Sequence, residues 1–131
     1  MSSFRRQKIL TVPVLAKEII SAFEQSKKSY QWAVGRYVIM PDHVHFFCQP
    51  DGDRTELSEF IRLLKKWTTR RAKEEKIGKY VWQREFFDHL LRSGESYEQK
   101  WEYVFYNPVR AGLCKQPEEW PYQGECHELI F

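Results

Sequence analysis

The feature that most constrains the fold of this chain is a pair of strand-like runs joined by a turn signal. Residues 30–40 (YQWAVGRYVIM) and 43–49 (HVHFFCQ) are both rich in β-branched and aromatic side chains, which favour strands. Pro41 and Asp42 lie between the two runs, and both residue types favour turns. The sequence therefore predicts an antiparallel hairpin in this part of the chain.

The second run of the hairpin contains two histidines one residue apart. Successive side chains on a strand point to opposite faces, so we expect His43 and His45 on one face and Val44 on the other. Two neutral imidazoles at this spacing can bind one metal ion from a rigid platform. Two half-buried aromatic rings that serve only packing would show the same pattern, so the spacing alone leaves both alternatives open.

The flanking segments predict a single α+β domain that uses all 131 residues. Residues 12–27 and 54–76 carry apolar side chains at helical spacing, and residues 93–108 begin as a loop and become a helix. Residues 86–92 are a further predicted strand. Antiparallel strands with helices packed on one face would bury these apolar stripes, which favours a ferredoxin-like sandwich.

The last predicted helix carries a candidate nucleophile. Residues four apart on a helix share a face, so Tyr103 and Asn107 can point into one site. A tyrosine hydroxyl becomes a useful nucleophile when a metal or a base helps it to lose its proton. The alternatives are core packing for Tyr103 and Tyr106 and helix capping for Asn107. Because a residue before proline is disfavoured in the helical region, we expect a helix break at Asn107, before Pro108.

Basic charge is concentrated locally. The net charge is only +3, which does not by itself define a nucleic-acid-binding protein. Basic side chains cluster in residues 2–8 and 63–73, a pattern that fits either a solvated face or a surface that contacts phosphates. The aromatic content of 16% suits both a large core and the stacking of bases. We expect Trp67 to belong to the core stripe of its helix.

Cysteine usage and hydropathy favour a cytoplasmic protein. Cys48, Cys114 and Cys126 form no CxxC pair, so neither a disulfide framework nor a zinc ribbon is indicated. The N-terminal residues lack the apolar run of a signal peptide, and no stretch has the length and hydropathy of a membrane span.

Three segments, in the order YVIMPDHVHFF, VWQREFFDHLLRS and WEYVFYNPVRAGL, together resemble the single-tyrosine HUH transposases. The similarity is greatest to the branch of REP-associated tyrosine transposases and extends from about Lys8 to Tyr122. It implies cleavage of single-stranded DNA near a folded hairpin, through a 5′-phosphotyrosine and a free 3′-OH. It also implies Mg²⁺ or Mn²⁺, which polarises the scissile phosphate.

The resemblance assigns roles to individual residues. His43 and His45 match the metal-binding histidines, Asn107 matches the third ligand, and Tyr103 matches the nucleophile, with Tyr106 as its rival. Two acidic residues, Asp42 and Asp88, are candidates to orient an imidazole from outside the metal site. The expected DNA contacts are Arg5, Arg6, Lys65, Lys66, Arg70, Arg71, His89 and Arg110.

The chain departs from the family pattern at its first strand, which is missing or reduced to residues 4–10 (FRRQKIL). In a ferredoxin-like sheet this strand is central and lies beside the HUH strand, so its loss would expose a sheet edge near the metal site. A rearranged sheet, a strand supplied by a second copy in a homodimer, and impaired activity are the expected alternatives.

Two other functions compete with the transposase-like one. The chain could bind DNA hairpins without cutting them, since the basic and aromatic surface does not depend on the histidines. It could instead be a metal-dependent hydrolase that uses His43 and His45 with His89 or His127. The hydrolase is the less favoured alternative.

Overall fold

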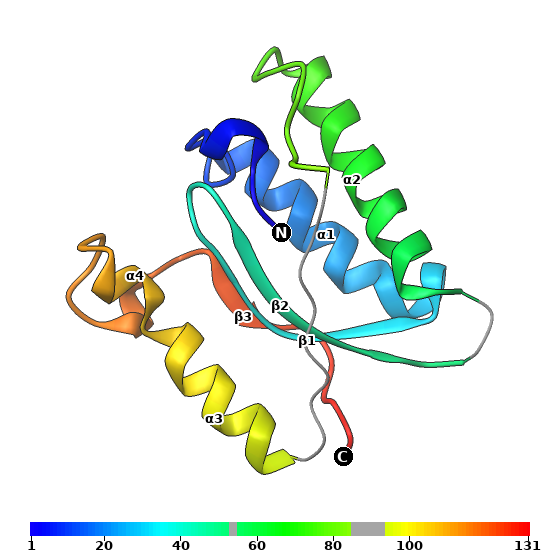
Figure 1. Ribbon diagram of the computed structural model, residues 1–131, viewed down its shortest axis with the longest axis vertical. Coiled ribbons are helices and arrows are strands. Elements are labelled where there is room, and N and C mark those ends of the chain that lie inside the picture. The colour runs from blue at the N-terminus through cyan, green and yellow to red at the C-terminus, as the bar shows by residue number, and fades with distance from the viewer. Residues whose placement is uncertain (53–54, 85–93) are drawn as a thin grey trace.

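The computed structural model describes residues 1–52, 55–84 and 94–131 (Figure 1). Its centre is an antiparallel sheet with strand order β2-β1-β3. The strands are β1 (Trp32–Ile39), β2 (Val44–Pro50) and β3 (Gln123–Glu125). The predicted α+β class with an antiparallel sheet is confirmed.

β1 and β2 form the predicted hairpin. Ile39 pairs with Val44 next to the turn, and the Met40 backbone N–H donates to the carbonyl of His43 at 2.8 Å. The ring of Phe46 lies 4.9 Å from that of Phe23, so every second side chain of β2 faces the helix that contains Phe23.

Two long helices, α1 (Pro13–Tyr30) and α2 (Leu57–Glu74), pack on this face of the sheet. The fully buried Phe23 and Phe60 lie at the centre of the shared core, and burial of each ring contributes about 2–3 kcal/mol. The rest of this core includes Leu10, Leu15, Ile19, Val34, Ile39, Val44 and Leu64.

The helix α3 (Gly94–Phe105) packs on the opposite face, so the expectation of helices on one face holds only for α1 and α2. Val104 of α3 packs with Val38 and Met40, which alternate with the residues that face α1. Both of these side chains are buried. Because β1 carries apolar side chains on both faces, each face requires a cover.

The prediction that Trp67 belongs to the core is wrong, because 39% of its surface is exposed. The buried stripe of α2 advances by four residues through Phe60, Leu64, Thr68 and Ala72, which leaves Trp67 beside it. Thr68 takes the inner position, and its hydroxyl oxygen accepts the indole N–H of Trp82 at 2.6 Å.

The N-terminal residues lie beside the start of β2, where the missing first strand was expected. Ser3 donates its backbone N–H to Asp42 O at 2.9 Å, and Val44 donates to Met1 O at 2.7 Å. Residues 81–83 bond to the other side of this segment. The first strand is therefore reduced to isolated bridges, and the sheet edge next to His43 is covered within the same chain.

The end of the chain supplies the third strand, which its sequence pattern did not predict. β3 pairs with β1 from Arg36↔Glu125 to Val38↔Gln123. It follows two short helices, α4 (Asn107–Arg110) and η2 (Pro117–Glu119). The predicted strand 86–92, with Asp88 and His89, lies outside the described residues. No helix in the described part of the chain has the length and hydropathy needed to cross a membrane.

Candidate metal and nucleophile site

His45 of β2 and His43, directly before this strand, lie close together on the face that is turned towards α3. Their ring centroids are 4.9 Å apart, with the planes at 89°. Phe47 comes two residues after His45 and shares its face, and its ring lies 4.9 Å from that of Tyr97 in α3. The predicted common orientation of His43 and His45 is therefore present in the structure.

Asp42 holds the ring of His43 in one tautomer. Its Oδ1 atom lies 2.7 Å from Nδ1 of His43. A carboxylate can only accept at this contact, so the proton is on Nδ1 and the lone pair is on Nε2. Partial burial alone would raise the pKa of Asp42, but hydrogen bonds from His43 and Arg6 hold this pKa below its ordinary value.

Arg6, a predicted DNA contact, bonds to the same carboxylate. Its Nε and Nη2 atoms both lie 3.0 Å from Oδ2 of Asp42. Arg5 and Arg6 have φ angles of 53° and 55°, a region that non-glycine residues seldom occupy. This turn in the backbone brings the guanidinium of Arg6 back to the hairpin, and its role as a DNA contact stays a prediction.

His45 is uncharged at neutral pH. Burial lowers its pKa to about 4, and electrostatic interactions with His43, with the α-amino group of Met1 and with Arg110 add to the effect. A neutral imidazole retains the lone pair that a metal ligand needs. The contribution of Arg110, which belongs to α4, also shows that this helix lies near the histidines.

The candidate nucleophile and the candidate amide ligand meet around Arg110. Its Nη2 donates to Tyr103 O at 2.6 Å and to Oδ1 of Asn107 at 2.8 Å. Its Cζ lies 4.0 Å from the centroid of the Tyr103 ring. The helix breaks one residue earlier than expected, at Tyr106, since α3 ends at Phe105 and α4 contains both Asn107 and Pro108. Arg110 therefore links α3 to α4 by contacting Tyr103, the candidate nucleophile, and Asn107, the candidate ligand.

The packing of α3 brings this group to the end of the sheet where the histidines lie. Val104, next to Tyr103, packs in a cluster with Met40, and Met40 bonds to His43 across the hairpin turn. The ring of Tyr103 itself is 68% exposed, against 43% for Tyr106. Tyr103 is thus an accessible hydroxyl on a helix that is anchored beside the turn.

His43, His45 and Asn107 have the types of donor atom that a divalent metal accepts. Nε2 of His43 and the neutral ring of His45 are suitable nitrogen donors, and the Asn107 oxygen keeps a second lone pair besides its bond to Arg110. Within the described residues, no three His, Cys, Asp or Glu side chains form a metal-binding group. A metal held by His43 and His45 would therefore need a third donor of another type, for which Asn107 is the candidate.

His127 does not complete such a site. Its backbone N–H donates to Val34 O at 2.9 Å, near the start of β1, whereas the histidines follow Ile39 at the opposite end. The alternative hydrolase that uses His127 with His43 and His45 is therefore excluded by the strand register.

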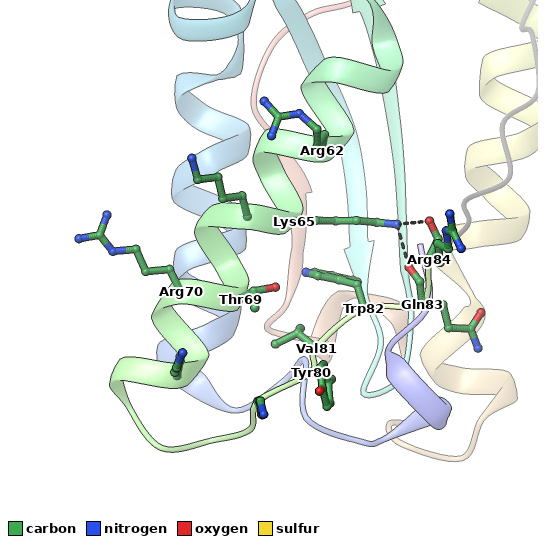
Figure 2. A pocket seen from close by; sticks show the side chains of 12 residues that line it. Arg62, Lys65, Thr69, Arg70, Tyr80, Val81, Trp82, Gln83 and Arg84 are labelled. Atoms are coloured by element: carbon green, nitrogen blue, oxygen red, sulfur yellow. Dashed lines mark hydrogen bonds between the residues drawn. The ribbon is translucent and has the colours of Figure 1, made fainter.

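A basic groove of about 570 Å³ lies between α2 and residues 79–84 (Figure 2). Lys65 spans it and donates to Gln83 O at 2.8 Å and to Arg84 O at 3.3 Å. None of the described residues that line the groove is acidic. Its cationic lining consists of Arg62, Lys65, Lys66, Arg70, Lys73, Lys79 and Arg84.

The predicted DNA contacts are distributed unevenly around this groove. Lys65, Lys66 and Arg70 line it. Arg71 does not, and instead forms ion pairs with Glu74 and Glu75 at 3.6 and 3.5 Å. The second wall, residues 79–84 (KYVWQR), was missed because its cations lie outside the basic runs. The alternation of basic and aromatic residues in this stretch is the signal that could have identified it.

Comparison with known proteins identifies the family. The model of the family described as "Transposase IS200 like" matches residues 1–105. A REP-associated tyrosine transposase of Escherichia coli K12 is 28% identical over 120 residues, which cover 90% of this chain and 68% of that protein. A Haemophilus influenzae protein assigned provisionally to the same group is 30% identical over 117 residues, covering 82% of this chain and 66% of that protein.

A solved structure agrees with these relatives. The structure of a REP-associated tyrosine transposase bound to a REP hairpin matches with a TM-score of 0.72 and 28% identity, covering 93% of this chain and 71% of that one. The chain spans about two thirds of the length of the curated relatives. Since the family model covers most of the chain, this protein belongs to the IS200-like transposase family.

Proposed function

We propose that this protein is a metal-dependent endonuclease and strand transferase that acts on single-stranded DNA next to hairpins. The observation that carries the proposal is the pairing of His43 and His45 on one face of the hairpin, with the Asp42 carboxylate fixing the tautomer of His43. Packing alone would not require a carboxylate on Nδ1, whereas metal-binding histidines commonly have such a partner.

The chemistry is assigned to Tyr103. Its phenolic oxygen attacks the scissile phosphorus, a new O–P bond forms to the 5′ side, and the 3′-oxygen leaves. The phenol loses a proton and the departing oxygen gains one, so the step conserves the phosphoester for a later attack by another 3′-OH. His43, His45 and Asn107 would hold Mg²⁺ or Mn²⁺, which when bound supplies polarisation of the phosphate.

Tyr103 is preferred to Tyr106 because of what surrounds each ring. Tyr103 is the more exposed of the two, and Arg110 contacts both its ring and its carbonyl. The ring of Tyr106 lies edge-on to Phe105, with the centroids 5.8 Å apart. Contact with a guanidinium favours Tyr103 as the group held ready for attack.

The basic groove is the proposed site for the hairpin. Phosphates on a folded stem would meet Lys65, Lys66 and Arg70 on one wall and Arg84 on the other. Such contacts release counterions, so the affinity should fall steeply with salt. The hairpin bound to the structural relative supports hairpin binding, and the charge of the groove is the reason for placing the hairpin there.

The test is the formation of a covalent protein–DNA adduct. A stem-loop made from an inverted repeat flanking the gene, with its single-stranded flank, is incubated with the protein and Mn²⁺ and resolved under denaturing conditions. The adduct should form with wild-type protein and with Tyr106→Phe, and it should disappear with Tyr103→Phe. An adduct that persists in Tyr103→Phe would contradict the assignment of the nucleophile.

A non-catalytic hairpin-binding protein is the second candidate. The groove favours it, because its walls come from α2 and residues 79–84 and include neither histidine. The two functions differ in adduct formation by the wild-type protein, whereas His43→Ala should keep the affinity for the stem-loop in both cases. An enzyme would lose the adduct in this variant, whereas a binding protein would form no adduct even as wild type.

A further inference from the structure

Two aromatic rings outside the core lie at the end of the basic groove. Tyr80 lines the groove and is 57% exposed. Its ring centroid lies 5.2 Å from that of Phe4 in the N-terminal segment. A cation accompanies each ring, since Nζ of Lys79 is 5.5 Å from the Tyr80 centroid and Cζ of Arg5 is 5.1 Å from the Phe4 centroid.

The two residues that follow Tyr80 pack against the rest of the protein, whereas Tyr80 is largely exposed. Val81 is buried in the main core, and Trp82 bonds to the hydroxyl of Thr68 in α2. Tyr80 instead points away from α2 (Figure 2) and meets Phe4. A large ring that the core does not use, beside a cationic groove, is the arrangement with which proteins stack unpaired bases.

The position of the rings links the groove to the histidines. Phe4 donates its backbone N–H to Val81 O at 2.7 Å, next to Tyr80. Ser3 of the same segment bonds to Asp42, the partner of His43. The wall of the groove, the N-terminal segment and the histidine hairpin are thus three adjacent pieces of backbone. Tyr80 and Phe4 lie where the wall of the groove meets the N-terminal segment.

We propose that Tyr80 and Phe4 bind an unpaired nucleobase where the single strand leaves the hairpin stem. The assignment rests on the proposed function, in which the groove holds the stem. The face of the base stacks on Tyr80, and Lys79 and Arg5 take the flanking phosphates. Because every base has a π face, the contact holds the strand without selecting its sequence.

The experiment compares two DNA probes that differ only in an unpaired nucleotide tail. One is a blunt stem-loop, and the other is the same stem-loop with a short thymidine tail that contains 2-aminopurine. Tyr80→Ala should weaken binding of the tailed probe by about 5- to 100-fold and that of the blunt probe by less than about twofold. Tyr80→Phe should retain wild-type affinity, and Tyr80→Leu, which keeps apolar bulk, should behave as Tyr80→Ala does.

Two further measurements distinguish a loss of base stacking from a loss of charge and from a loss of folded structure. Quenching of 2-aminopurine fluorescence on binding should be lost in Tyr80→Ala and kept in Lys79→Ala, which should instead lower the salt dependence by about one counterion. Phe131→Ala is the matched control, because Phe131 is 52% exposed and its ring lies 5.3 Å from that of Tyr97. Phe131→Ala should change the affinity for neither probe.

The result that overturns the proposal is an equal effect of Tyr80→Ala on both probes, or no effect on either while the wild-type protein still binds the stem-loop. Hairpin binding would then stand and only the stacking site would fail. If the wild-type protein binds neither probe at any salt concentration, the proposed function fails together with this inference.

Discussion

Oδ1 of Asp42 lies 2.7 Å from Nδ1 of His43, so the acidic residue of the turn directs Nε2 of the neighbouring imidazole away from itself. Arg6 balances the charge of this carboxylate from the other side. The N-terminal segment therefore contributes to the proposed metal site, although it forms only bridges in place of a full strand.

Removal of this carboxylate should weaken metal binding. We expect Asp42→Ala to lower the affinity for Mn²⁺, measured by titration calorimetry, by about 10- to 100-fold. Asp42→Asn keeps an oxygen that can accept from Nδ1 and should have a smaller effect. The ¹⁵N shifts of His43 should report the Nδ1–H tautomer in the wild type and a mixture in Asp42→Ala. Unchanged shifts and affinity in Asp42→Ala would show that the carboxylate does not orient the ring.

Arg110 should affect the rate of adduct formation more than DNA affinity. Because its guanidinium contacts the ring and carbonyl of Tyr103 and the amide of Asn107, Arg110→Ala leaves the nucleophile less well positioned. We expect the single-turnover rate of adduct formation to fall by about 10- to 100-fold. Arg110→Lys should recover only part of the rate, because an ammonium cannot reproduce the planar fork.

The control for this variant is Lys100→Ala, which removes an exposed cation from α3, the helix that carries Tyr103. It should leave the rate close to that of the wild type. If Arg110→Ala lowers the affinity for the stem-loop and the rate in equal measure, Arg110 acts on DNA binding and not on the position of Tyr103.

The partly buried imidazole of His45 should make stability depend on pH in metal-free protein. Its pKa of about 4 in the folded state lies below the ordinary 6.5, so the unfolded chain binds the proton more readily between these values. The free energy of unfolding should therefore fall as the pH decreases from about 6.5 to about 4, by up to about 3 kcal/mol. Urea denaturation in EDTA at a series of pH values measures this.

His45→Gln should flatten the pH dependence over this interval. Loss of the carboxylate contribution of Asp42 should remain, at lower pH, because a depressed folded pKa stabilises the protein only above that pKa. An unchanged slope in His45→Gln would assign the pH dependence to other groups.

Gly35 should be required for α3 to sit on the sheet. A Cβ atom there would lie 2.6 Å from the Tyr97 hydroxyl and 2.7 Å from Cγ of Leu129. We expect Gly35→Ala to lower the free energy of unfolding by about 1–3 kcal/mol, and to slow adduct formation, since α3 carries Tyr103. Gly78→Ala is the control, because its nearest contact would be 3.9 Å away.

The clash at Gly35 can be tested by removing its partner. Tyr97→Phe deletes the hydroxyl that accepts from the Arg36 backbone N–H at 2.9 Å, so it is destabilising alone. In the Gly35→Ala background it also relieves the clash, and the two effects should be less than additive by at least about 0.5 kcal/mol. Strict additivity would mean that α3 already moves away in Gly35→Ala.

Local patterns were sufficient for the hairpin and for the shared face of His43 and His45. Strand alternation and turn residues act over a few residues, so they can be read from the sequence. The restriction before proline placed the helix break one residue too late, because Asn107 and Pro108 both belong to α4. The same rules failed for Trp67, because helical spacing defines a stripe but not which of its edges faces the core.

The order of residues determined the strand–turn–strand unit, the two-histidine face and the helix that carries Tyr103. Only the tertiary structure decided that α3 covers the opposite face of the sheet, that β3 is the third strand, and that Arg6 reaches Asp42 across 36 positions. It also brought residues 79–84 beside α2 to form the groove. The physical reason is that a partner distant in the chain is selected by packing of the whole core, and no local period encodes it.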